Sequence, residues 1–93
     1  MMGRFGDAIK IYQKSIECFE KLTYHNSESK LNSSLIFSML GLVFKYKRDR
    51  VNTEIYLQKS LSRFKENNFD EQEYLYELAQ FYMYIALIQE YLD

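Results

Sequence analysis

Few side chains in this 93-residue chain could take part in covalent or acid–base chemistry. His25 is its only histidine and lies in the polar stretch 23–29, while Cys18 is its only cysteine. A histidine acts as a general base when it is held against its substrate, and a thiol nucleophile needs such a base beside it. Cys18 and His25 are separated by the end of a predicted helix, so we expect a solvated loop histidine and a packed or idle thiol. We predict no catalytic residue and expect that the protein is not an enzyme.

Acidic side chains gather in front of the last apolar segment. Such a cluster could bind a cation, but the sequence has no calcium loop of the Asp-x-Asp-x-Asp-Gly type and no histidine nearby. Carboxylates are also favourable at the N-terminus of a helix, where they meet the positive end of its dipole. The sequence therefore predicts a helix start here, without a metal or a cofactor. The residues concerned are Asp70, Glu71, Glu73 and Glu77.

The run Lys-Tyr-Lys-Arg-Asp-Arg at residues 45–50 is the only basic cluster. It could contact nucleic-acid phosphate, with Tyr46 stacked on a base. Against this, the net charge is −1, and nucleic-acid binders usually carry a broader basic surface. Residues 1–50 hold nine Lys/Arg and five Asp/Glu, whereas residues 51–93 hold three and eight. This asymmetry would suit head-to-tail association or an oppositely charged neighbour, but we favour a solvated surface without a partner. We favour a solvated turn for the basic run.

Composition favours an all-α protein. The chain is 47% hydrophobic, contains no proline and only three glycines, and shows no two-residue alternation typical of strands. A single cysteine fits a reducing compartment. The apolar runs are too short for the roughly 18–20 residues of a membrane span, and no signal-peptide pattern is visible. We expect a cytoplasmic protein without a membrane partner.

Apolar spacing predicts four helices, at about 6–22, 30–46, 51–65 and 70–91. In the first, Ala8, Tyr12, Ile16 and Phe19 recur at steps of three and four residues. The stretches 23–29 and 47–50 are predicted loops. Asp70 followed by Glu73 predicts a capping-box start for the fourth helix.

The chain also resembles itself at two offsets. A shift of 45 residues lays the segment 13–16, Gln-Lys-Ser-Ile, on the segment 58–61, Gln-Lys-Ser-Leu. A shift of 38 residues lays Phe37, Leu40, Gly41 and Phe44 on Leu75, Leu78, Ala79 and Tyr82. The first and third helices are thus one type and the second and fourth another, which is the signature of a repeat.

These positions resemble the tetratricopeptide repeat, in which a helix A pairs with a helix B. Phe37, Leu40-Gly41 and Phe44 match helix A, and Leu75, Leu78-Ala79 and Tyr82 match it again. The helix B pattern is matched by Thr53, Leu57 and Ser60-Leu61, and by Ala8, Tyr12 and Ser15-Ile16 after a turn at Gly3-Arg4-Phe5. Small residues at Gly41, Ala79, Ala8, Ser15 and Ser60 would let helices approach closely.

The resemblance implies an all-α fold of antiparallel helix hairpins, stacked as a right-handed solenoid fragment in the order B–A–B–A. Residues 1–22 would be helix B of a truncated repeat, residues 30–65 one full repeat, and residues 70–92 a helix A or capping helix. The chain departs from the family in its longer periods, against the usual ~34 residues, in lacking a proline after helix B, and in having Arg48 where a turn glycine is expected. Longer, irregular repeats of this kind resemble the sensor domains of bacterial peptide-pheromone receptors, the Rap-type phosphatases and related transcription regulators.

In that family the A helices line a concave groove, which implies a candidate peptide site here. Tyrosine rings with polar neighbours suit an extended peptide. The alternative is that Leu35, Leu42 and Tyr84 simply pack against neighbouring helices. The matching positions are Leu35, Ser38, Leu42, Lys45 and Tyr46 on the second helix, and Glu73, Tyr76, Gln80, Met83 and Tyr84 on the fourth.

We therefore expect a non-enzymatic module that binds a peptide or protein, as part of a larger regulator. The alternative is a homo-oligomerisation module, because exposed apolar faces on the terminal helices promote self-association. A small nucleic-acid binder acting through residues 45–50 is the third and less favoured hypothesis.

Overall fold

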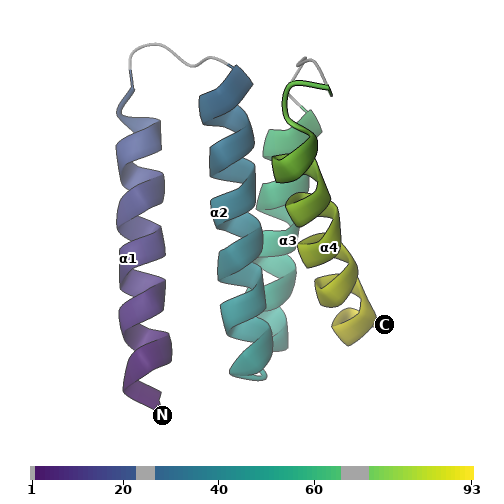
Figure 1. The fold of residues 1–93 in the computed structure, drawn as a ribbon. Coiled ribbons are helices and arrows are strands. Elements are labelled where there is room, and N and C mark those ends of the chain that lie inside the picture. Colours follow the sequence, from purple (N-terminus) through teal and green to yellow (C-terminus); the bar gives the residue numbers. More distant parts are fainter. Residues whose placement is uncertain (1, 23–26, 66–71) are drawn as a thin grey trace.

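The computed structural model describes residues 2–22, 27–65 and 72–93. In these residues it contains four α-helices and no strand, which confirms the all-α prediction. The helices are α1 (Met2–Glu20), α2 (Ser27–Tyr46), α3 (Arg50–Lys65) and α4 (Leu75–Leu92). Successive helices run in opposite directions, so that α1 and α3 point the same way with α2 antiparallel to both (Figure 1).

Three predicted boundaries are wrong. α1 begins at Met2, so residues 3–5 lie within a helix instead of a turn. α2 begins at Ser27, and the predicted loop therefore includes its first residues. Glu28 in the first turn meets the positive end of the helix dipole, which favours a helix start here.

The third wrong boundary is the start of α4. Glu73 lies in a turn before the helix, and the residue at the N-cap, Tyr74, makes no side-chain capping bond. Asp70 lies outside the described residues. Glu73 is exposed and Leu78 is the first buried residue of this described segment, so the helix begins one turn before its first core contact.

A tight turn joins α2 to α3. Arg48 has a φ of 60°, the left-handed conformation that glycine usually adopts after a helix. The Arg48 amide donates to the Lys45 carbonyl at 2.9 Å, and the Asp49 amide donates to the Phe44 carbonyl at 2.9 Å. This pair of bonds is a Schellman motif, which satisfies the last carbonyls of α2. Arg48 thus adopts the left-handed turn conformation without a glycine.

Asp49 also caps the next helix. Its carboxylate accepts from the Asn52 amide at 3.1 Å and from Asn52 Nδ2 at 2.7 Å. These two hydrogen bonds lower the pKa of Asp49 below its ordinary value of 3.8, and the bond from the Asn52 side chain has the larger effect. A carboxyl whose pKa is lower in the folded state stabilises that state at every pH above its ordinary, unfolded-state pKa. The stabilisation is lost as the pH falls through the lower pKa of the folded state.

We therefore expect the pH dependence of stability to change in Asp49→Asn. Asparagine remains a good N-cap but cannot titrate. The difference in melting temperature between the wild type and the variant should be largest near neutral pH and should shrink as the pH falls below about 4. Thermal unfolding followed by circular dichroism from pH 7 to pH 2 measures this difference. A constant difference over the whole range would contradict the role of the charged carboxylate.

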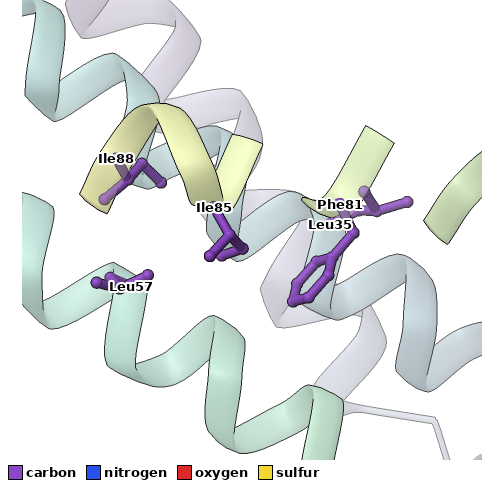
Figure 2. Packing of buried hydrophobic residues seen from close by; sticks show 5 residues of the cluster. All are labelled: Leu35, Leu57, Phe81, Ile85 and Ile88. Atoms are coloured by element: carbon purple, nitrogen blue, oxygen red, sulfur yellow. The ribbon is translucent and has the colours of Figure 1, made fainter. Parts of the chain in front are cut away.

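The core lies on both sides of α2. One cluster joins α2, α3 and α4 and consists of Leu35, Leu57, Phe81, Ile85 and Ile88 (Figure 2). The other joins α1 to α2 through Ile16, Phe37, Leu40 and Phe44, with Tyr56 of α3 packed against it. Because α2 contributes to both clusters, it is the helix that contacts all three others.

Small residues bring the helices together at α2, as predicted for Gly41 and Ser60. A Cβ atom on Gly41 would lie 2.9 Å from Ile88 Cδ1. The buried Ser60 hydroxyl donates to the Ser34 carbonyl of α2 at 2.9 Å. The matching prediction for Ala79 is wrong, because α4 turns Leu78 and Phe81 inward and leaves Ala79 exposed.

None of the helices in the described part of the chain is long and apolar enough to span a membrane.

Candidate functional site

A hollow of about 630 Å³ lies between α1 and α3. We call it the α1–α3 groove. Side chains of α2 contribute to its floor, so all three helices build it. Its volume falls within the roughly 300–1,000 Å³ of ordinary ligand sites. The floor consists of Ile16, Phe37, Leu40 and Tyr56; the α1 wall carries Gln13, Glu17 and Glu20; the α3 wall carries Gln58, Lys59, Ser62 and Arg63.

Aromatic rings form much of the floor. The Tyr56 ring stacks on Phe44 with centroids 5.4 Å apart, and it also stacks on Phe37 at 6.2 Å. Gln13 Nε2 of the α1 wall donates to the Tyr56 hydroxyl at 3.3 Å, which joins α1 to α3 at one level. Aromatic pairs of this kind prefer defined arrangements of their rings. The floor therefore presents a largely aromatic, apolar surface.

The two walls carry opposite charges. Lys59 Nζ lies 5.2 Å from the centre of the Tyr56 ring, and the Arg63 guanidinium lies 5.8 Å from that of Phe37. Glu17 and Glu20 are exposed on the opposite wall. Within the described residues, neither Glu17 nor Glu20 forms an ion pair with the cations of the α3 wall. The groove thus separates a row of carboxylates from a row of cations over an apolar floor.

No family model, curated protein or solved structure matches this chain. Its function must therefore be argued from the site, because a fold alone does not fix a function.

The ten predicted groove residues do not form one surface. Leu35 and Ser38 are buried, and the Ser38 hydroxyl donates to the Leu35 carbonyl at 2.6 Å. Leu42 and Tyr84 are half-buried and pack against the cluster between α2, α3 and α4. For these apolar positions the packing alternative describes what the structure shows.

The remaining six predicted positions are at least partly accessible. Lys45 and Gln80 are half-buried, whereas Tyr46, Glu73, Tyr76 and Met83 are exposed. Lys45 and Tyr46 line a smaller hollow of about 220 Å³ with Arg48 and Tyr91. None of the ten predicted residues lines the α1–α3 groove.

The residues considered for catalysis and metal binding are dispersed. Cys18 is exposed on α1, and His25, Asp70 and Glu71 lie outside the described residues. Within residues 2–22, 27–65 and 72–93, no three side chains of the metal-binding types are grouped.

Partial burial, followed by the charges of Glu73, Glu28 and Glu77, raises the pKa of Tyr74 above its ordinary value of 10.0.

The basic run at residues 45–50 has structural roles. Asp49 caps α3, and Arg50 Nη2 donates to the Leu92 carbonyl at the end of α4. Lys45 lies over the Tyr46 ring, 4.8 Å from its centre. These contacts agree with the predicted inter-helix turn.

Sequence reasoning missed the α1–α3 groove although it noticed the segments that build it. The shift of 45 residues pairs Gln13 with Gln58, and both line the groove from opposite walls. The similarity of the two segments was therefore visible in the sequence. The space between them was not, because it depends on how far apart α2 holds them.

Proposed function

We propose that this protein is a non-catalytic module that binds a peptide or a segment of another protein in the α1–α3 groove. The observation that carries the proposal is the groove itself, in which a stacked aromatic floor lies between two walls of opposite charge. Binding sites are typically apolar hollows with a few placed polar groups. From the resemblance we retain the proposal that the module serves a larger peptide-responsive regulator.

We also propose that the helices form tetratricopeptide-like repeats, with α1 and α3 of type B and α2 and α4 of type A. Two observations support this. α2 contacts both of its neighbours and α4. The buried Gly41 lies against Ile88 of α4 and the Thr53 carbonyl of α3, as a small residue at a helix crossing should.

A selection experiment tests the binding proposal. Peptides would be selected from a displayed random library against the wild type, and their affinities compared with Ser62→Trp. The exposed Ser62 lines the groove, so an indole there should block it and weaken binding about tenfold or more. The control is Gln89→Trp on the exposed face of α4, which should bind like the wild type.

Tyr46→Ala and Tyr76→Ala test, with the same peptides, the groove that the sequence predicted on α2 and α4. Both side chains are exposed, so neither change should disturb the fold. We expect unchanged affinity for both variants. Peptides that tolerate Ser62→Trp but lose affinity with either tyrosine change would refute the α1–α3 groove as the site.

Self-association is a second candidate function, favoured by the outer face of α4. Tyr76 is 73% exposed and Met83 is 54% exposed, with Leu75 and Tyr82 exposed beside them. A contiguous apolar face of this kind favours association. Sedimentation velocity over a concentration series should show a dimer for the wild type and a monomer for Tyr76→Gln/Met83→Gln. A wild type that remains monomeric throughout would end this hypothesis.

A further inference from the structure

We infer that the occupant of the α1–α3 groove is an amphipathic α-helix with basic side chains on one flank and acidic side chains on the other. This inference rests on the proposed function and adds the chemistry of the ligand. It follows from two features of the groove, the nature of its backbone and the placement of its charges.

The backbone around the groove favours a helical ligand. All of its lining residues lie within α1, α2 or α3, between residues 13 and 63. Inside a helix the amides and carbonyls are already paired with each other, so the groove offers no free edge to an extended peptide. A helix satisfies its own backbone and needs only side-chain contacts. The α1 wall spans eight residues, or about 11 Å, and the α3 wall spans six, or about 8 Å, which together suit about two turns of such a ligand.

The charges form two facing rows. The Gln13–Tyr56 hydrogen bond fixes the level of α1 against α3, and both helices run in the same direction (Figure 1). Counting seven residues along each helix from this bond places Glu20 opposite Arg63. Glu17 and Lys59 lie about one helical turn closer to the Gln13–Tyr56 hydrogen bond. Charges three or four residues apart share one face of a helix, so each wall is a row of one sign.

These rows determine what a ligand must carry. A helix lying on the floor turns one flank toward Glu17 and Glu20 and the other toward Lys59 and Arg63. Lysine or arginine on the first flank and aspartate or glutamate on the second would complement both walls. A ligand with one sign on both flanks meets repulsion at one wall, which costs affinity and disfavours that partner.

Three synthetic helical peptides test the inference. They share one apolar stripe and differ only in their flanks, which carry Lys and Glu, Lys and Lys, or Glu and Glu. Fluorescence anisotropy at low salt should show the Lys/Glu peptide binding the wild type about tenfold more tightly than the other two. A fourth peptide, the Lys/Glu sequence with a central proline, should bind poorly because proline breaks the helix.

Charge reversal on the protein should switch the preference. Glu17→Lys/Glu20→Lys makes both walls basic and should prefer the Glu/Glu peptide. Lys59→Glu/Arg63→Glu makes both walls acidic and should prefer the Lys/Lys peptide. All four side chains line the groove surface, and circular dichroism would verify that the variants remain helical.

The outcomes separate this inference from the proposed function. Equal binding of all three charge patterns, lost in Ser62→Trp, would overturn the charge inference and leave the groove as a binding site. Undiminished binding of the proline peptide would overturn the helical ligand. Failure of every designed peptide would overturn the inference, whereas the library selection decides the proposed function independently.

Discussion

Replacing Phe81 with alanine is expected to destabilise the folded state by about 3–5 kcal/mol. Phe81 is 1% exposed and stacks on Phe64 with centroids 4.4 Å apart. It lies in the cluster that attaches α4 to α2 and α3. A chain of this length has a stability on the order of 5–14 kcal/mol in total. A large part of the folded population is therefore expected to be lost at elevated temperature.

Urea unfolding followed by circular dichroism measures the effect. Phe81→Leu keeps most of the buried volume and should cost clearly less than the alanine change. The comparison variant is Tyr82→Ala on the same helix; Tyr82 is exposed and only the edge contacts of its ring with Phe64 and Phe81 would be lost, so it should cost about 1–2 kcal/mol. Equal losses for Phe81→Ala and Tyr82→Ala would show that the α4 cluster does not have the packing described.

Replacing Gly41 with leucine is expected to cost about 3 kcal/mol, in spite of the better helix propensity of leucine. Even a Cβ atom here would approach Ile88 Cδ1 to 2.9 Å, and Ile88 is completely buried. The Thr53 carbonyl oxygen would already be in van der Waals contact with the same Cβ atom at 3.8 Å, so the larger part of a leucine side chain has little space. Either α4 must move away from α2 or the core must repack.

Gly6 provides the control for this change within the same chain. No atom lies within 4 Å of a Cβ built on Gly6, so Gly6→Leu should be neutral or stabilising by up to about 1 kcal/mol. A double mutant tests the contact itself. Ile88→Ala should relieve the strain of Gly41→Leu, so that the combined loss is smaller than the sum by about 1 kcal/mol or more. Additive losses would place the strain elsewhere.

The sequence predicted the helices and one core face well, because their apolar positions have a single periodic solution. Ile16, Leu40 and Phe44 were expected inward and are buried. In α4 the same reasoning gave the wrong face. The helix is apolar on nearly every side, so the pattern 75, 78, 79 and 82 and the pattern 78, 81, 85 and 88 fit equally well. Only contact with α2 and α3 decides between them.

The candidate site could not be predicted for a different reason. Phe37 matched the repeat pattern as a packing residue, and Gln13 appeared only as part of a repeated segment. Both line the groove because α2 holds α1 and α3 apart. The distance between two helices that are not neighbours in sequence is a tertiary property, and no local spacing encodes it.

The position of α1 has a consequence for motion. Among the four described helices, the backbone of α1 lies beside that of α2 alone, whereas α2, α3 and α4 contact one another. Local unfolding begins where few buried contacts must be broken, so α1 can open while the other three helices keep their common core. Opening would remove one wall of the α1–α3 groove. A ligand in the groove would stabilise the closed form and slow the hydrogen exchange of α1 amides. The exchange rate of α1, the helix with the fewest contacts to the others, would therefore measure whether the groove is occupied.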